Sequence, residues 1–219
     1  MKPKDLKSPY KWEGRCPLLQ DRVFYVPGYY HKHRAELFPS WQELFGNDHP
    51  VCIEYCSGNG EWIIHKAQSH PEINWVAVEL NFDRVRKIYS KRTNEKIENL
   101  LIISGEALNF TREYLPRHCT DAVYINFPDP WPKDRHAKHR LLQLPFAEEL
   151  RRIVVLKGTL TLVTDSVPYL EQMQEVITAV PSWIKTSCPH EEDYGNSYFE
   201  RLWKSLGRSI YFLHYENRC

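Results

Sequence analysis

The sequence predicts an α/β fold: a doubly wound, mostly parallel sheet of seven strands, the last of them antiparallel. Three observations carry this prediction. Short β-rich runs recur from residue 51 onward, and stretches with helical periodicity separate the first five of them. The runs are almost continuously apolar, as in parallel strands that helices cover on both faces. The last run has no helix after it, so we expect it to insert antiparallel.

The elements follow one another in a regular order from residue 51. We expect strands at residues 51–56, 74–80, 100–104, 121–127, 159–164, 183–187 and 209–215, because these runs are rich in β-branched and aromatic residues. Apolar residues at helical spacing predict helices at residues 61–68, 82–97, 107–114, 141–154 and 167–180. Ligands of such folds bind at the carboxyl ends of the strands.

The first 50 residues are less regular. They contain six prolines, and lysines stand at positions 2, 4, 7 and 11. We expect residues 1–50 to form a flexible basic segment and a covering layer, with a short helix near residues 35–45. Residues 51–219 then form the main domain.

Composition limits the classes of protein. With 219 residues, 42% hydrophobic and 26% charged, the chain fits one folded domain and excludes disordered and fibrous classes. The net charge of +1 means that a nucleic-acid site must be a local basic patch. Neither a signal peptide nor an apolar run of membrane-spanning length is present, so we expect a cytoplasmic protein without membrane contact.

Four successive strands each bring a carboxylate to the same edge of the sheet, and a Gly-x-Gly turn follows the first strand. The carboxylates are Glu54, Glu79, Glu106 and Asp129. A dinucleotide would place its pyrophosphate near these charges and be repelled. S-adenosylmethionine carries a sulfonium, an ammonium and ribose hydroxyls, which carboxylates pair with. Each acid alone is best explained as a solvated charge, but the set of four favours this cofactor.

The segment after the fourth strand combines prolines, an acid, an aromatic residue and a basic run. We expect Pro128 and Pro130 to push Phe127 and Asp129 into extended conformations, which holds Asp129 in place before any ligand arrives, and Trp131 can stack on a base. The basic run has the composition of a loop that contacts phosphates. Its members are Lys133, Arg135, His136, Lys138, His139 and Arg140. The two histidines lack a third ligand at zinc spacing, so we expect no metal.

Two further polar segments are less specific. Asp165 or Ser166 either caps the next helix, with Pro168 in its first turn, or Asp165 reads a substrate base. Both interpretations remain open. The polar and aromatic segment at residues 193–201 is, from composition alone, a loop.

Together these motifs resemble the bacterial tRNA (guanine-N7-)-methyltransferase family. The shared features are Glu-x-x-x-Gly-x-Gly, Phe-Pro-Asp-Pro-Trp with its basic run, Thr-Asp-x-x-Pro-Tyr and a late Phe-Glu, over roughly residues 44–216. Phe-Pro-Asp-Pro-Trp is the most specific of them. The resemblance implies a Rossmann-like methyltransferase fold and methylation of guanosine 46 in the tRNA variable loop. It implies S-adenosylmethionine as cofactor, tRNA as partner, and a monomer or homodimer.

The resemblance also implies site residues at matching positions. The cofactor would contact Glu54, Glu79, Glu106 and Asp129, and Asp129 would be the active-site residue. Substrate would be bound by Lys133, Asp165, Ser197, Tyr198, Phe199 and Glu200. RNA would be contacted by Arg135, His136, Lys138, His139 and Arg140.

Three positions depart from the family pattern. Cys56 stands where the first glycine of the turn is usual, so its Cβ would crowd the cofactor. Glu106 replaces the more usual aspartate. Ser197 and Tyr198 replace Thr-Lys, which removes one positive charge from the substrate loop, although a tyrosine can stack on a base.

Two other functions are compatible with parts of the sequence. A degenerate, non-catalytic RNA-binding protein would keep the basic run and lose the cofactor. A small-molecule methyltransferase would keep the cofactor site and leave the basic run unexplained. A nicotinamide-dependent oxidoreductase is the least favoured, because of the carboxylates.

Overall fold

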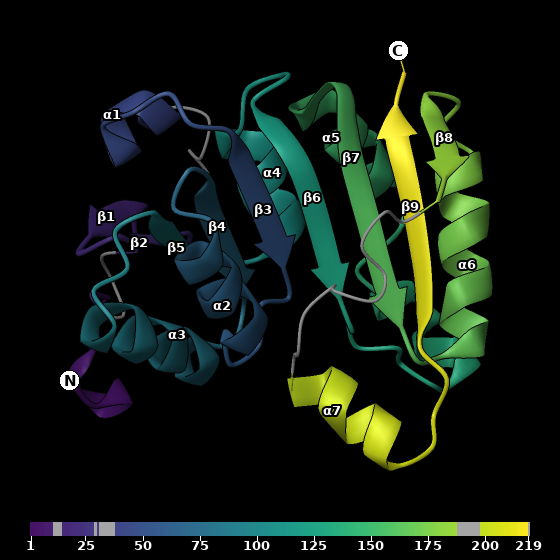
Figure 1. Cartoon of the computed structure of the whole chain (residues 1–219), viewed down its shortest axis with the longest axis horizontal. Helices are drawn as coiled ribbons and strands as arrows, with labels where there is room; N and C mark the ends of the chain where they lie inside the picture. The colour runs from purple at the N-terminus through teal and green to yellow at the C-terminus, as the bar shows by residue number, and fades with distance from the viewer. Residues whose placement is uncertain (11–14, 29, 31–37, 188–197, 219) are drawn as a thin grey trace. The chain divides into compact units, whose positions relative to one another are not determined.

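The computed structural model describes residues 1–10, 15–28, 30, 38–187 and 198–218. The chain divides into two compact units, Met1–Leu115 and Pro116–Cys219. Each unit consists of strands with helices packed against them (Figure 1). We describe each unit by itself.

The first unit contains five described strands, in the spatial order β1, β2, β5, β4, β3. The pairs β2–β5, β5–β4 and β4–β3 are parallel, and β1–β2 is antiparallel. The strands are β1 (Leu18–Gln20), β2 (Val23–Tyr25), β3 (Val51–Tyr55), β4 (Asn74–Glu79) and β5 (Leu100–Ser104). Every residue of β3 and β4 is buried, as parallel strands with helices on both faces require.

Helices lie on both sides of these strands. Figure 1 shows α2 and α3 in front of them and α4 behind. The helices of this unit are η1 (Pro3–Asp5), α1 (Trp41–Phe45), α2 (Glu61–Ser69), α3 (Phe82–Asn94) and α4 (Ala107–Tyr114). The expected helix near residues 35–45 is confirmed over α1, which begins with a Ser40–Glu43 capping box. Residues 35–37 lie outside the described part of the chain.

The N-terminal segment adds two strands that the sequence analysis missed, so the expected count of seven is corrected to nine for the described residues. The turn between β1 and β2 consists of Asp21 (φ 51°) and Arg22 (φ 64°). Two left-handed residues define a type I′ hairpin turn, which normally carries Asn-Gly or Asp-Gly. Arginine at the second position hides that signal. β2 then extends the parallel sheet beside β5.

Residues before β1 also contact the first unit. Leu6 is buried, and its carbonyl oxygen accepts a hydrogen bond from Arg86 Nε at 3.0 Å. The Met1 carbonyl oxygen accepts from Ser90 Oγ at 2.8 Å. Both donors belong to α3, so one face of this helix packs on the strands and another holds η1.

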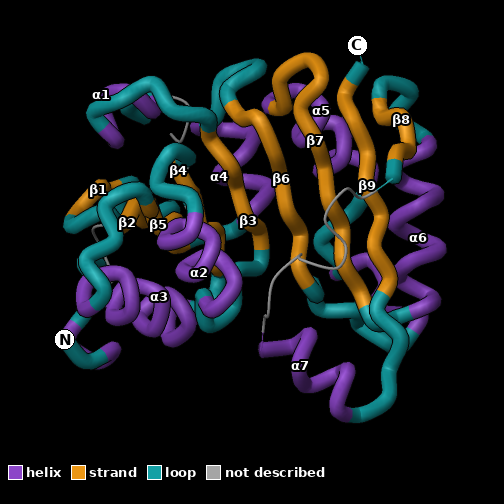
Figure 2. The backbone as a smooth tube through the Cα atoms, in the orientation of Figure 1, coloured by secondary structure: helices purple, strands orange, loops and turns teal. Residues whose placement is uncertain are grey.

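The second unit contains the remaining described strands in the spatial order β6, β7, β9, β8. β6 and β7 are parallel, and β9 is antiparallel to both of its neighbours, which confirms the expected last strand. The strands are β6 (Thr120–Asn126), β7 (Val154–Thr164), β8 (Trp183–Thr186) and β9 (Tyr211–Asn217). Figure 2 shows β7 and β9 as long neighbouring strands.

Helices α5 (Leu144–Ile153) and α6 (Val167–Thr178) contact each other in this unit, and α6 also contacts β7. Phe146 of α5 and Tyr169 of α6 are fully buried in its core. The unit also contains η3 (Asp134–His139) and α7 (Tyr198–Ser205). All seven expected strands and five expected helices from residue 51 onward are therefore confirmed, with ends that shift by a few residues. No described helix is long and apolar enough to cross a membrane.

Candidate functional site

Three of the four predicted carboxylates lie at one edge of the first unit. Strands β3, β4 and β5 are parallel neighbours, with Tyr55 paired to Val78 and Glu79 paired to Ser104. Their carboxyl ends therefore meet at the same edge. Glu54 is the second-last residue of β3, Glu79 is the last residue of β4, and Glu106 lies two residues after the end of β5.

Glu79 links two strand ends. Its side chain is buried, and Oε2 accepts a hydrogen bond from the Gly58 amide at 2.8 Å while Oε1 accepts from the Asn81 amide at 2.8 Å. Burial raises the pKa of the Glu79 carboxyl; the amide hydrogen bonds and the Arg84 guanidinium oppose this shift. A buried carboxylate thus holds the turn after β3 against the end of β4.

The turn after β3 has an unusual backbone. Cys56 (φ 61°), Gly58 (φ 56°) and Gly60 (φ 77°) all occupy the left-handed region. At Gly60 a Cβ would come within 2.8 Å of Ile88 Cγ1, so the glycine also permits close packing on α3. Lys91, from the same helix, donates from Nζ to the Asn59 carbonyl oxygen at 2.8 Å. The turn is held in place from the helix side.

The other two carboxylates differ in environment. Glu54 is only 2% exposed. Glu106 is half-buried and caps α4, accepting hydrogen bonds from the amides of Leu108 at 3.0 Å and Asn109 at 2.6 Å. The structure therefore gives Glu106 a capping role in addition to the cofactor contact expected from the sequence.

Leu80 is a site candidate that the sequence analysis missed. It directly follows Glu79, and 70% of its surface is exposed although it is a large apolar residue. A buried carboxylate acceptor beside an exposed apolar side chain suits a nucleoside, which has hydroxyls that donate and a base that needs a nonpolar surface. The residues at this edge fit the adenosine part of S-adenosylmethionine. No signal in the sequence indicated Leu80, because it was expected to belong to the strand at residues 74–80, whereas β4 ends at Glu79.

Asp129 belongs to the second unit. The Phe127 amide donates to the Val163 carbonyl oxygen at 2.9 Å, the last backbone bond that ties the chain to β7 before Asp129. Asp129 is exposed, and its Oδ1 accepts a hydrogen bond from the Trp131 amide at 3.0 Å. Both Phe127 (φ 47°) and Trp131 (φ 40°) have left-handed backbones. The prediction that Pro128 makes Phe127 extended is therefore wrong, and the acid lies in a strained loop.

Most of the basic run is exposed, as expected for a surface that binds phosphates. Lys133, Arg135, Lys138 and His139 are exposed, and η3 covers the middle of the run. The Trp131 ring contacts the His136 and His139 rings at centroid distances of 5.8 and 5.3 Å. Arg140 differs from the others, because it is only 6% exposed.

Asp165 has a partner that sequence spacing did not indicate. Its Oδ2 accepts a charged hydrogen bond from Arg208 at 2.6 Å, and the Arg208 guanidinium lies 4.1 Å from the Trp203 ring centroid. Ser166 stands at the N-cap position of α6 without a side-chain cap bond. The Asp165 side chain is thus oriented by an ion pair and does not cap α6.

The expected substrate loop is described only in part. Ser197 and the side chains of Tyr198 and Phe199 lie outside the described part of the chain. Glu200, in α7, is 7% exposed and pairs with Lys204 Nζ at 2.6 Å.

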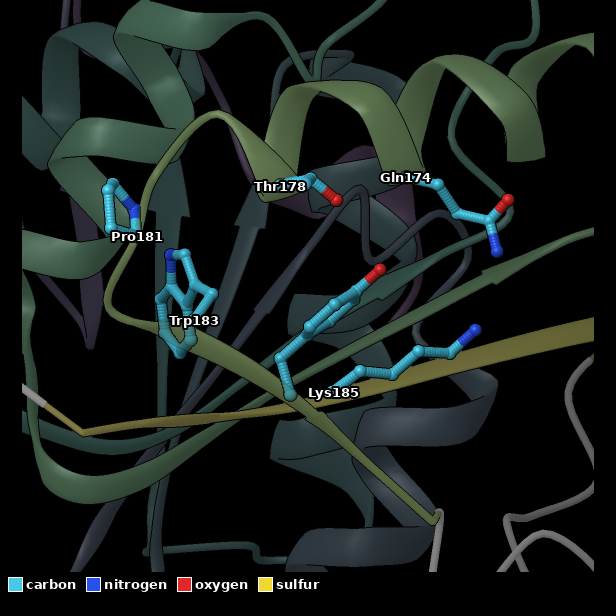
Figure 3. Close-up of a pocket in the computed structure, with 6 residues that line it drawn as sticks. Gln174, Thr178, Pro181, Trp183 and Lys185 are labelled. Carbon is cyan, nitrogen blue, oxygen red and sulfur yellow. The ribbon is translucent and has the colours of Figure 1, made fainter.

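A separate hollow of ≈ 470 Å³ lies near the end of α6 and the start of β8 (Figure 3). It is lined by Gln174, Thr178, Pro181, Trp183, Lys185 and Tyr215. None of the predicted site residues contributes to it. Because β8 runs in the same direction as β7, its start faces away from the strand ends that carry Asp129 and Asp165. Among the described residues, no group of three or more His, Cys, Asp or Glu side chains is arranged to hold a metal ion.

Comparison with known proteins identifies the family. A family model described as "Putative methyltransferase" matches residues 48–213. The tRNA (guanine-N(7)-)-methyltransferase of Chlamydia muridarum is 47% identical over 100% of this chain and 99% of its own length. That of Chlamydia trachomatis is 45% identical over the same shares. The chain belongs to the tRNA (guanine-N(7)-)-methyltransferase family.

Solved structures of other methyltransferases have the same fold as this member of the tRNA (guanine-N(7)-)-methyltransferase family. The 16S rRNA methyltransferase KamB superposes with a TM-score of 0.59 at 15% identity, over 82% of this chain and 93% of KamB. At that identity the likeness shows the fold alone. It confirms the Rossmann-like methyltransferase fold that the resemblance implied.

The left-handed backbone at Cys56 leads to a stability prediction. Replacing Cys56 by glycine should stabilise the protein by roughly 0.5–1 kcal/mol, because the strain of a Cβ at positive φ exceeds the entropy that glycine loses on folding. Urea unfolding measures the change. Cys56→Ala is the matched control, since it removes the thiol and keeps the Cβ. Equal stability of the two variants would contradict the strain argument.

Proposed function

We propose that this protein transfers a methyl group from S-adenosylmethionine to N7 of a guanosine in tRNA, giving 7-methylguanosine. The observation that carries this function is the full-length match to tRNA (guanine-N(7)-)-methyltransferases at 45–47% identity. The specific Phe-Pro-Asp-Pro-Trp segment and its exposed basic run support it.

The cofactor edge of the first unit suits this reaction. We assign Glu79 to the ribose hydroxyls, Glu106 to the adenine end and Glu54 to the methionine part. When bound, S-adenosylmethionine supplies an electrophilic methyl group on a sulfonium centre. Glu79 is prepared for its role, because two backbone amides already fix its carboxylate.

The chemistry makes few demands on proton transfer. N7 of guanine has a lone pair and no proton to lose, so methylation at this atom needs no general base. The protein instead orients the base and stabilises the positive charge that develops on the purine. We assign that electrostatic role to the Asp129 carboxylate, which the Trp131 amide orients.

Substrate recognition is assigned to the second unit. The Asp165 carboxylate accepts hydrogen bonds from the Watson–Crick edge of guanine. Arg208 orients that carboxylate through its ion pair. Lys133 and residues 197–200 bind the substrate nucleotide, and the exposed cations of the basic run contact phosphates.

Finer points of the proposal come from the resemblance and from composition. The target is guanosine 46 in the variable loop, and the protein acts in the cytoplasm as a monomer or homodimer. Residues 51–219 form the methyltransferase domain, with residues 1–50 as its basic covering segment.

Labelled S-adenosylmethionine and bulk tRNA test the function. Nucleoside analysis should find 7-methylguanosine. Asp129→Asn, which keeps the acceptor for Trp131, should lower the single-turnover rate by about 100-fold with a much smaller change in cofactor affinity. Glu148→Gln, an exposed neutralisation in the same unit, should retain the wild-type rate. Absence of label in every product would favour a non-catalytic RNA-binding protein. Label only in small molecules would favour a small-molecule methyltransferase.

The raised pKa of Glu79 predicts a pH dependence of cofactor binding. Ribose hydroxyls donate to the ionised carboxylate, so binding favours deprotonation and releases a proton in the acidic range. Affinity for S-adenosylhomocysteine should fall as the pH drops through the raised pKa, at a higher pH than an exposed glutamate would produce. Calorimetry in buffers of different ionisation enthalpy measures the proton. The Glu79→Gln variant should bind S-adenosylhomocysteine weakly, with an affinity that does not change over this pH range. A wild-type pH dependence in that variant would show that Glu79 is not the titrating group.

Neutralising the exposed cations should weaken tRNA binding in a salt-dependent way. The double variant Arg135→Gln and Lys138→Gln should raise the tRNA Kd and reduce the slope of log K against log salt by about two, since each lost phosphate contact removes about one unit. Lys157→Gln, an exposed lysine elsewhere in the unit, is the control. An unchanged slope would show that the run does not contact RNA.

A further inference from the structure

Arg140 ends the basic run, yet its guanidinium points into the second unit. The residue is only 6% exposed. Its Nε donates to the Pro130 carbonyl oxygen at 2.7 Å, and one of its terminal nitrogens donates to Gln172 Oε1 at 2.6 Å. The guanidinium carbon lies 5.2 Å from the centroid of the Tyr169 ring. These contacts hold the Arg140 side chain inside the unit, whereas the lysines before it in the basic run are exposed to solvent.

The Pro130 oxygen belongs to the same peptide group as the Trp131 amide. A peptide group is planar, so fixing its oxygen also fixes the direction of its N–H. That N–H donates to Oδ1 of Asp129 at 3.0 Å. Arg140 and the Asp129 carboxylate are therefore connected through a single rigid group.

This peptide group needs external support. Trp131 has a φ of 40°, which costs a residue with a Cβ roughly 1–2 kcal/mol. Pro128, Pro130 and Pro132 remove backbone donors on every second residue, so the loop has few amides of its own with which to stabilise its shape. Strained loops persist only where neighbouring groups determine them, and Arg140 is such a group.

The other end of the connection is anchored on α6. Tyr169 is fully buried, and its hydroxyl accepts a hydrogen bond from the Leu142 amide at 3.0 Å. Gln172 donates from Nε2 to the Leu142 carbonyl oxygen at 3.3 Å. The chain just after Arg140 is thus fixed to the same two α6 residues that hold the guanidinium. This anchor also gives a structural role to the tyrosine of the Thr-Asp-x-x-Pro-Tyr motif.

We propose that Arg140 is a positioning residue, anchored on Gln172 and Tyr169, that fixes the Pro130–Trp131 peptide and thereby aims the Asp129 carboxylate. This assignment differs from the RNA contact expected for Arg140 from the sequence. Its effect on the reaction rate rests on the function proposed above, but its effect on the loop does not.

Arg140→Lys tests the proposal, because it keeps the positive charge and loses the planar donor pair. Gln172→Ala tests the anchor without changing any charge, and it carries the test if the lysine variant fails to fold. In both variants, amide exchange over residues 127–133 should accelerate by about tenfold or more. The single-turnover methylation rate at saturating tRNA should fall by about tenfold to 100-fold. The tRNA Kd and its salt slope should stay at wild-type values.

Arg92→Lys is the matched control. Arg92 is 8% exposed and donates from Nε to the Leu100 carbonyl oxygen at 2.9 Å, so it is a buried arginine with the same kind of bond in the first unit. Its substitution should leave exchange over residues 127–133 and the rate per folded molecule unchanged. Thermal unfolding of each variant corrects for the folded fraction.

Two results would overturn the proposal. One is wild-type exchange and rate in Arg140→Lys and Gln172→Ala. The other is an Arg140→Ala variant with a raised tRNA Kd and a lower salt slope, both restored by lysine, which would identify a phosphate contact. If the wild-type protein methylates no tRNA, the proposed function fails, and the exchange measurements still decide whether Arg140 holds the loop.

Discussion

The buried Glu79 carboxylate is the interaction on which the cofactor edge depends. Removing a charge from water is costly, and here two backbone amides and a nearby guanidinium offset part of the cost. Because one of those amides is that of Gly58, the carboxylate that we assign to the ribose hydroxyls also fixes the turn after β3. The turn and the binding group cannot vary independently. A substitution at Glu79 therefore also changes the backbone of the turn after β3.

The loop that carries Asp129 is stabilised in a different way from the turn after β3. Prolines deprive it of donors, and two of its residues have left-handed backbones, so neither a strand nor a helix determines its shape. Within the described loop, the hydrogen bond to the Asp129 side chain comes from the Trp131 amide. Glu79 ends a strand and accepts hydrogen bonds from a turn amide and an N-cap amide, whereas Asp129 lies in an irregular loop that side chains from elsewhere must hold. We infer that the geometry of the second site is the more sensitive to distant substitutions.

Periodicity predicted seven strands and five helices from residue 51 onward, because the buried strands are apolar runs and the helices have one apolar side. It did not predict η3 or α7, and α7 overlaps the segment at residues 193–201 that was interpreted as a loop. It failed for β1 and β2, which have three residues each and a turn without glycine. The carboxylates at strand ends were predictable from strand order alone. The burial of Arg140 was not, since a run of basic residues looks uniformly solvated, and the Asp165–Arg208 pair joins positions 43 residues apart. Contacts between distant positions leave no local pattern.

The pairing of β2 with β5 has a consequence for how the chain is made. Val23 lies beside Ile102, and the Met1 carbonyl is held by Ser90. On the ribosome, the N-terminal residues emerge long before the strand and helix that receive them. They stay without their partners until synthesis passes residue 104, and contacts between such distant positions form slowly. Residues 23–25 thus wait for the last strand of the first unit before they gain their parallel partner.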